Sequence, residues 1–394
     1  WEQRKLSDIT LKIGSGKTPS GGKNAYVDDG IPLIRSQNIN NDRVDLEDIV
    51  FIDEETDNSM ENSRVFTDDV LLNITGASIG RSAVYRGKDK ANVNQHVCII
   101  RPTKDFDSDF IQLNLASNFG QKQIDASQAG GGREGLNFQE IGKMSFMFPS
   151  NQEQMKIGVY FNHIDYLITL HQRKCEETKK LKKYMLQKMF PQNGKRVPEI
   201  RFVGFTEDWE QRKLKETIEY IVDNRGKNPD YYCSEGIPVI DNFMIRNSLY
   251  PDLNTATRFI DENLYQNFIR KYNEEDDILL TLVGNGIGNI TLFPKDKAVI
   301  IQNTLGFRAK EDKKFLFFLL MANNEALVKL DRGMAQPSIR QDEILDLDIY
   351  VPSNSEQIQI GEYFTYLDNL ITLHQRKYEE LQKIKKFMLQ NMFI

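Results

Sequence analysis

The side chains of this chain that could do chemistry are of the types that contact nucleic acid, and they lie between the expected strands. Arg, Asn and Gln can form paired hydrogen bonds with base edges, whereas Lys, Arg, Ser and backbone N–H groups hold phosphates. Any one of them alone is an ordinary surface residue, so the set predicts a nucleic-acid interface more strongly than its members do. The candidates are Lys17, Arg35, Ser36, Gln37, Asn38, Ser78, Arg81, Arg133 and Asn137 in the first half, and Arg225, Lys227, Asn242, Arg246, Asn285, Asn289, Arg332, Gln336 and Arg340 in the second.

No catalytic or metal-binding pattern accompanies these residues. The run Gly284 to Gly288 resembles a nucleotide-binding loop, but such a loop opens a helix and precedes an acidic residue by about 20 positions. Here the β-prone run ITLF follows, so a structural turn is predicted. The sequence contains no Walker loop, helicase box or adenine-methylation motif, and its three cysteines and four histidines form no zinc pattern. A non-catalytic chain that binds no metal or cofactor is expected.

Composition and charge are those of an ordinary globular protein. The 394 residues are 40% hydrophobic and 27% charged, and 51 basic against 57 acidic residues give a net charge of −6. That total disfavours a nucleic-acid binder, although the segments from His171 to Phe190 and from His374 to Ile394 are basic. The longest apolar run, Phe315 to Ala322, is too short to span a membrane. A cytoplasmic location is expected.

The elements that must position the candidate residues are revealed by an internal repeat. The octamer LITLHQRK occurs at Leu167 to Lys174 and again at Leu370 to Lys377. Aligned without a gap, Glu153 to Phe190 and Glu356 to Phe393 share 25 identities in 38 positions. Each copy follows a proline and opens with Ser-x-x-Glu, which predicts a helix start with a capping box. Two copies of one long helix are therefore expected.

These two helices carry a narrow apolar stripe with heptad spacing. A helix of this length would extend for roughly 57 Å, too far for its stripe to be covered by one ordinary globular core. The other helix is the nearest partner, so an antiparallel coiled-coil pair with histidines at or beside its seam is predicted. The expected packing residues are Ile157, Phe161, Ile164, Ile168, His171, Ile360, Phe364, Leu367, Ile371 and His374.

The globular parts are duplicated as well. WEQRKL stands at Trp1 to Leu6 and at Trp209 to Leu214, and a segment before the second copy has no counterpart before the first, so a missing native N-terminal segment is expected. DDVLLNITGASIGRSAVY from Asp68 and DDILLTLVGNGIGNITLF from Asp276 both predict strand, glycine turn and strand. An α+β fold follows, with a pseudo-twofold repeat. Its expected parts are a first domain at 1–150, a helix at 151–190, a linker at 191–208, a second domain at 209–352 and a helix at 353–394.

The loops between these matching frames differ. Ser36-Gln37-Asn38 stands opposite Asn242-Phe243-Met244, and a glycine-rich loop at 128–137 stands opposite one that contains Pro337. Domains that bound the same ligand would be expected to keep their loops at least as similar as their helices. Two binding domains that recognise two different things on one scaffold are therefore predicted.

With its two repeated LITLHQRK helices and the FVGFTEDWEQRKL entry at Phe202 to Leu214, the chain resembles the specificity subunits of type I DNA restriction-modification systems, which serve in bacterial defence. The resemblance covers the whole chain. It implies two target recognition domains, each reading one half of a split, asymmetric double-stranded DNA site, with the helices as a spacer between them. It also implies two methyltransferase subunits docked on the helices, and restriction subunits that join the complex. S-adenosylmethionine, ATP and magnesium would then be bound by these partners and not by this chain.

Two other classes of function stay open from the sequence. One is a coiled-coil scaffold or adaptor whose two domains bind peptides, which assembly with a methyltransferase and salt-sensitive DNA binding would distinguish. The other is a small-molecule enzyme built on the turn at Gly284 to Gly288, which thermal stabilisation of the isolated chain by S-adenosylmethionine or a dinucleotide would favour.

Overall fold

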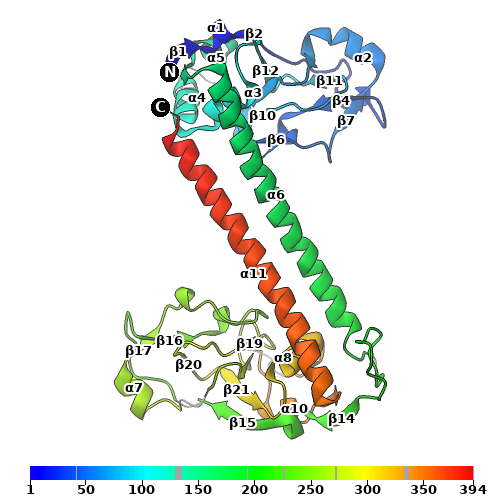
Figure 1. Cartoon of the computed structure of the whole chain (residues 1–394), viewed down its shortest axis with the longest axis vertical. Helices are drawn as coiled ribbons and strands as arrows, with labels where there is room; N and C mark the ends of the chain where they lie inside the picture. Colours follow the sequence, from blue (N-terminus) through cyan, green and yellow to red (C-terminus); the bar gives the residue numbers. More distant parts are fainter. Residues whose placement is uncertain are drawn as a thin grey trace. The chain divides into compact units, whose positions relative to one another are not determined.

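The computed structural model describes residues 1–40, 42–128, 135–192, 194–224, 227–270, 273–331 and 337–393. The chain forms two compact units, Trp1–Leu170 with Lys377–Ile394, and His171–Arg376. Two long helices, α6 (Asn151–Lys188) and α11 (Asn354–Asn391), each contribute one part to either unit (Figure 1). None of the helices in the described ranges combines the length and apolarity that a bilayer crossing requires. The mixed α and β class and the two long helices confirm the predicted fold.

The first unit holds two main sheets. An antiparallel sheet has the strand order β10-β9-β12-β2, and a five-stranded mixed sheet has the order β3-β7-β4-β11-β8, with β4 and β11 parallel. Two smaller pairs, β1-β13 and the hairpin β5-β6, complete it. The strands are β1 (Glu2–Lys5), β2 (Thr10–Ser15), β3 (Tyr26–Val27), β4 (Ile31–Ile34), β5 (Ile39–Asn40), β6 (Arg43–Val44), β7 (Val50–Ile52), β8 (Arg64–Val65), β9 (Val70–Asn73), β10 (Ser82–Val84), β11 (Ala91–Val93), β12 (Val97–Pro102) and β13 (Ser145–Phe148). The shorter helices are α1 (Leu6–Ile9), α2 (Glu54–Ser59), α3 (Ser108–Ala116), α4 (Asn118–Ser127) and α5 (Phe138–Lys143).

The second unit repeats the antiparallel sheet of the first in the order β19-β18-β21-β15. A three-stranded sheet, β17-β16-β20, and the pair β14-β22 accompany it. The strands are β14 (Glu210–Lys213), β15 (Ile218–Asp223), β16 (Ile237–Ile240), β17 (Phe259–Ile260), β18 (Ile278–Thr281), β19 (Ile290–Leu292), β20 (Val299–Ile300), β21 (Thr304–Ala309) and β22 (Asp348–Val351). The shorter helices are α7 (Glu262–Asn267), α8 (Lys313–Ala322), α9 (Asn324–Val328) and α10 (Gln341–Leu345).

The glycine run in the second half is a hairpin turn. Strands β18 and β19 on either side of it pair antiparallel, with Leu280 opposite Ile290. Gly284, Gly286 and Gly288 have φ angles of 89°, 86° and 79°, which a residue with a Cβ adopts only with strain. A strand, and no helix, follows the run, so the predicted structural turn is confirmed.

The apolar ends of the long helices are buried in the cores of the units. In the first unit, the rings of Phe161 on α6 and Phe393 after α11 lie 6.0 Å apart and join the core around Phe110. In the second unit, the corresponding rings of Phe364 and Phe190 lie 5.7 Å apart and join the larger core. The predicted stripe therefore packs on domain residues as well as on the other helix. Phe161, Ile164, Ile360, Phe364 and Leu367 are buried, and Ile157, Ile168, His171, Ile371 and His374 are half-buried.

The predicted capping boxes form only in part. Helix α6 begins at Asn151, and the Ser150 hydroxyl accepts a long hydrogen bond of 3.4 Å from the Glu153 N–H. At α11 the buried Glu356 carboxylate accepts two hydrogen bonds of 2.7 Å from the Arg201 guanidinium. A pair of hydrogen bonds to a guanidinium is stronger than one bond to a neutral backbone N–H. This difference explains why Glu356 binds Arg201 and does not close the capping box.

Each long helix has one glycine where a domain helix meets it end-on. A Cβ at Gly158 would lie 2.9 Å from Asp107 Oδ1, and one at Gly361 would lie 2.6 Å from Asp312 Oδ1. These aspartates cannot move freely, because they cap α3 and α8 by accepting backbone N–H groups. The glycines therefore let each long helix approach the start of a domain helix.

We expect Gly158→Ala and Gly361→Ala each to lower the free energy of unfolding by about 1–3 kcal/mol through overpacking. Alanine normally favours a helix over glycine by about 1 kcal/mol, so the expected sign is opposite to the ordinary one. Denaturant unfolding measures the change. Gln172→Ala, at an exposed position of α6, is the control, with an expected change within about 0.5 kcal/mol. Stabilisation by either glycine substitution would show that the close approach does not limit packing.

Within the second unit the two helices run antiparallel and meet at a pair of histidines. Their Nδ1 atoms lie 2.9 Å apart, so one ring donates to the other. The pKa of His374 is lowered from its ordinary value of 6.5, chiefly by burial and then by the charges of His171 and Lys174. A histidine whose pKa is lowered in the folded chain binds protons more tightly in the unfolded chain, so its protonation favours unfolding. The contribution of His374 to the free energy of unfolding is therefore present above pH 6.5 and decreases as the pH falls.

We therefore expect the thermal midpoint of helix unfolding, followed by circular dichroism, to decrease when the pH is lowered from 7.5 to 5.5. The decrease should be smaller in His374→Gln. His163→Gln, at an exposed position, serves as the control and should keep the wild-type pH dependence. An identical pH dependence in His374→Gln and the wild-type chain would contradict this account.

Candidate nucleic-acid interface

The loop after β4 in the first unit combines one structural and one exposed candidate residue. Buried Asn38 donates to the carbonyls of Asp45 and Asp48 at 3.1 Å each, and its Oδ1 accepts the Arg35 N–H at 3.0 Å. Gln37 beside it is exposed, and its Nε2 donates to the Asp48 carboxylate at 2.8 Å. Asn38 thus shapes the loop, while the neighbouring Gln37 is exposed to solvent.

The glycine turn between β9 and β10 lies against this loop. Asn73, buried at the end of β9, donates to the Ser36 carbonyl at 2.9 Å. Exposed Arg81 donates to Asn40 Oδ1 at 2.6 Å, and Ser78 on the turn is half-buried. Loop and turn therefore form one continuous surface around Gln37 and Arg81.

The second unit joins the same two segments with different residues. Asn242 donates to the Val283 carbonyl at 2.7 Å, beside the glycine turn. Asn289 donates to the Ile245 carbonyl at 3.0 Å and accepts from Asn247 at 3.2 Å. Arg246 and Asn285 remain exposed on this surface. The equivalent surfaces of the two units thus present unlike side chains on matching frames.

The other candidates are more dispersed. Asn137 caps α5 by accepting the Gln139 N–H at 2.9 Å, and the Lys227 ammonium lies 5.1 Å from the ring centroid of Phe268. Arg340 is exposed and pairs with Asp342 at 2.6 Å, and Lys17 is exposed on the loop after β2. The candidates Arg133, Arg225, Arg332 and Gln336 lie outside the described residues. Contact with nucleic acid remains a prediction for all of these positions.

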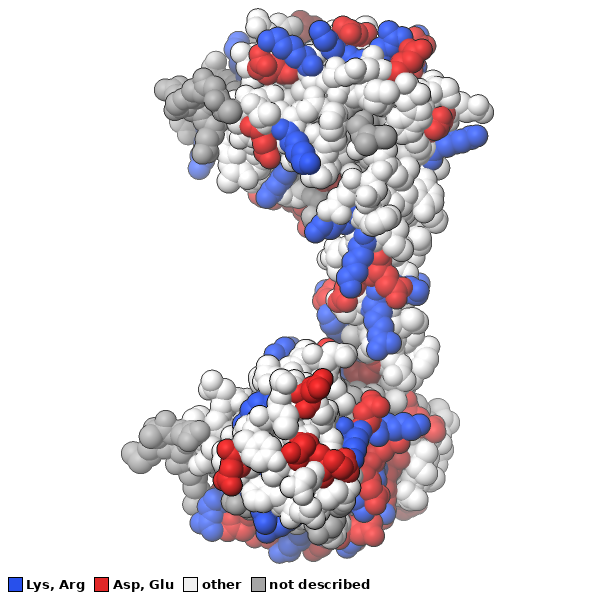
Figure 2. All heavy atoms as spheres, turned by 90° about the vertical axis from the view of Figure 1, so that its left-hand side faces the viewer, with Lys and Arg blue, Asp and Glu red and all other residues white. Residues whose placement is uncertain are grey.

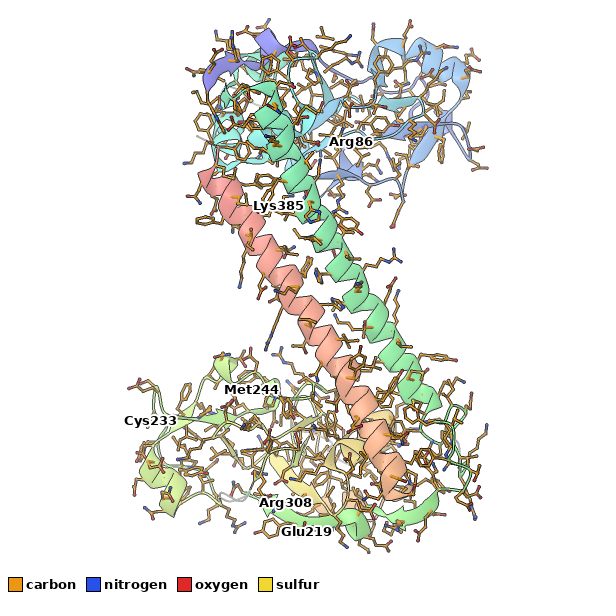
Figure 3. All side chains as sticks on the ribbon, viewed as in Figure 1. Arg86, Glu219, Cys233, Met244, Arg308 and Lys385 are labelled. Atoms are coloured by element: carbon orange, nitrogen blue, oxygen red, sulfur yellow. The ribbon has the colours of Figure 1, made fainter. Side chains whose placement is uncertain are left out.

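Each unit also has an ion pair between a half-buried arginine and a buried aspartate, which sequence reasoning missed. Arg101 donates two hydrogen bonds of 2.8 Å to Asp69, and Arg308 donates two of 3.0 Å to Asp277. The pKa of Arg308 is raised, chiefly by its hydrogen bonds to Asp277. Both pairs join the central strands at the end remote from the glycine turn (Arg308 is labelled in Figure 3). The signal was present, because the aspartate and arginine recur in both copies of the repeat.

The surface charge is mixed. On the visible face of each unit, lysine and arginine side chains lie among aspartates and glutamates, and no single sign covers either unit (Figure 2). Across the described ranges, no group of three or more His, Cys, Asp or Glu residues is placed to hold a metal ion.

The chain is similar to proteins of one family over nearly its whole length. A family model described as the type I restriction modification DNA specificity domain matches residues 1–180 and 206–383. A putative type I restriction enzyme MjaX specificity subunit of Methanocaldococcus jannaschii is 23% identical over 98% of this chain and 91% of its own. The MjaVIII specificity subunit of the same organism is 27% identical over 81% of this chain and 76% of its own.

Solved structures share the fold. The crystal structure of the S subunit of a type I restriction-modification system from M. genitalium has a TM-score of 0.64 at 14% identity, covering 100% of this chain and 96% of that chain. A structure described under complex assembly and conformational transition of the type I system has a TM-score of 0.52 at 16% identity, covering 99% and 96%. At these identities the likeness is one of fold.

The two neighbouring residues Asn38 and Gln37 are expected to behave differently when truncated. Asn38→Ala removes the three hydrogen bonds that this buried side chain makes with the loop backbone and should lower the free energy of unfolding by about 1–3 kcal/mol. Gln37→Ala, on the exposed side of the same turn, should change it by less than about 0.5 kcal/mol. Denaturant unfolding of both variants measures the contrast. Equal effects would mean that Asn38 does not hold the loop.

Proposed function

The chain belongs to the family of type I restriction-modification DNA specificity subunits, and we propose that it is the non-catalytic subunit that reads a bipartite, asymmetric DNA site, one half-site for each domain. The observation that carries the proposal is the repeated four-stranded sheet, β10-β9-β12-β2 and β19-β18-β21-β15, whose glycine turns lie against unlike loops in the two units. Residues 1–150 and 209–352 are proposed as the two reading domains, and the long helices as the spacer between the half-sites.

Exposed loop residues are proposed to read bases in the major groove. Gln37 and Arg81 in the first unit, and Arg246 and Asn285 in the second, are exposed and of the types that bond base edges. Each wrong base pair in such a site costs about 1–3 kcal/mol, so several contacts per half-site are needed. Asn38, Asn242 and Asn289 support this reading indirectly, because their side chains hold the loops in shape.

The partners are proposed to be two methyltransferase subunits, one on each of two equivalent helix patches. Leu181 and Tyr184 on α6 are 45% and 51% exposed, and their repeat equivalents Ile384 and Phe387 on α11 are 47% and 66% exposed. Exposed apolar pairs at equivalent positions on both helices fit two copies of one partner. Restriction subunits are proposed to join the assembly.

The chemistry is proposed to belong to these partners in the cytoplasm. The methyltransferases use S-adenosylmethionine to methylate an adenine that is flipped out of the duplex, and the restriction subunits use ATP and magnesium. This chain only positions them. Basic surface supplied by the partners would make up for its net charge of −6, so weak DNA binding by the isolated chain is expected.

A genome-wide map of methylated adenines in the source cell tests the reading function. Deleting the gene should remove one split motif, consisting of two short blocks around a constant gap. Exchanging residues 1–150 for those of a relative should change one block and leave the other unchanged. An unchanged map after deletion, in a cell that expresses the chain and a methyltransferase partner, would refute the function and favour the adaptor alternative.

Partner docking predicts a stepwise loss of stoichiometry. Tyr184→Glu or Phe387→Glu should each remove one methyltransferase copy, because a charge replaces an apolar contact, and the double variant should remove both. Size-exclusion chromatography with light scattering of the co-expressed complex gives the copy number. Tyr220→Glu, at an exposed position of β15 and so outside both long helices, is the control and should keep two copies. Two copies on the double variant would exclude these patches as docking sites.

A further inference from the structure

The loop of the first unit that contains Gln37, called the reading loop below, is held to the long helices by a charge cluster around Lys385. The Lys385 ammonium on α11 lies 2.7 Å from Asp42 Oδ2, and 2.7 and 2.8 Å from the two carboxylate oxygens of Asp165 on α6. Gln112 on α3 also donates to Asp42, at 3.3 Å. Asp42 stands in the turn of the β5-β6 hairpin, which directly follows the loop containing Gln37. One lysine of α11 therefore contacts both α6 and this hairpin (Lys385 is labelled in Figure 3).

A second contact ties the same hairpin to α6. The Arg43 guanidinium donates to the Asp165 carbonyl at 2.8 Å and also contacts the Thr169 hydroxyl. One lysine and one arginine thus lie beside two aspartates in a single cluster. Only 11% of the Lys385 side chain is exposed, so its charge is poorly screened by solvent and depends on the two carboxylates.

The pKa of Lys385 follows from this geometry. Burial lowers its pKa, but the charges of Asp42 and Asp165 outweigh burial and leave the pKa raised above its ordinary value. The ammonium is therefore charged at neutral pH. Asp42 has a φ angle of 60°, a conformation that aspartate tolerates better than most residues.

The second unit repeats the helix part of this cluster without the loop part. The repeat equivalents of Lys385 and Asp165 are Lys182 and Asp368, which pair at 2.6 and 2.8 Å. Counting from the shared Ile39 and Ile245, the positions of Asp42 and Arg43 are occupied by Ser248 and Leu249, which carry no charge. There, Asn247 binds Asn289 and the Ile290 N–H, so that loop is held by its own glycine turn.

We propose that Lys385, with Asp42 and Asp165, is a positioning residue that holds the reading loop of the first domain against the long helices, and that recognition of the first half-site alone depends on it. This inference rests on the proposed reading function. The lysine touches no base in this scheme. It acts through the β5-β6 hairpin, because loss of the clamp removes one support of the loop around Gln37 and loosens it, while the loop of the second domain has no part in this clamp.

The test compares Asp42→Asn and Lys385→Met with Lys182→Met in the full chain. Asp42→Asn keeps the shape of the side chain and removes only its charge, so it avoids the two unpaired carboxylates that Lys385→Met leaves behind. Lys182→Met removes the matching helix ion pair, which has no loop tether, and is the control. Lys385→Arg restores a positive charge and should recover most of the wild-type behaviour.

Two readouts separate the clamp from the reading function. Hydrogen exchange on the full chain needs no DNA: amides at 36–48 should exchange about tenfold faster in Asp42→Asn and Lys385→Met than in wild type or Lys182→Met. The methylated-adenine map should show discrimination against single mismatches falling about tenfold in one block, the one that changes when residues 1–150 are exchanged.

Unchanged exchange at 36–48 in both Asp42→Asn and Lys385→Met would overturn the clamp whatever the DNA result. Relaxation of both blocks to the same extent, or relaxation in Lys182→Met, would overturn its restriction to the first half-site. Faster exchange with a wild-type chain that directs no split-motif methylation would instead leave the clamp standing and refute the proposed reading function. Failure of the inference and failure of the function therefore give different results.

Discussion

Burial of the apolar stripe on the two long helices is the interaction on which much of the structure depends. A pair of helices buries only the seam between them, whereas each stripe ends in large aromatic residues. The rings of Phe161 with Phe393, and of Phe190 with Phe364, are therefore covered by domain cores. Burying side chains of this size is among the largest stabilising terms available to a chain. The glycines at 158 and 361 serve the same end, because they let a domain helix abut each long helix.

The polar contacts around these apolar cores are partly shared and partly different between the two units. Both units keep a lysine–aspartate pair on the helices and an arginine–aspartate pair between central strands. Both loops are hydrogen-bonded to their own glycine turn, but only the first also reaches the helices, through Asp42 and Arg43. A duplicated frame can thus support loops that have diverged, because the frame does not depend on their side chains.

The same distinction separates the candidate residues. Asn38, Asn242 and Asn289 have the side-chain chemistry of base-reading residues, but they use it on backbone carbonyls, Asn38 within its own loop and the other two between the loop and the glycine turn. Gln37, Arg81, Arg246 and Asn285 are exposed beside them. Neighbouring positions in one turn can therefore have opposite roles, one holding the loop and one facing solvent. Residue type alone cannot distinguish them, since an amide makes equally good bonds to a carbonyl and to a base.

Some features of this protein follow from the sequence alone. The exact LITLHQRK repeat, the heptad spacing and the paired strand–glycine–strand segments predicted the long helices, the duplication, the mixed fold and the structural turn at Gly284, because these depend on local periodicity and on glycine's freedom at positive φ. Tertiary structure alone decided that Glu356 binds Arg201 instead of closing its capping box, that Asn38 is buried while Gln37 is exposed, and that Lys385 meets Asp42. These outcomes join residues far apart in the chain or depend on which side of a turn is covered. They are decided by which groups lose water together, a property of the folded chain that no local pattern records.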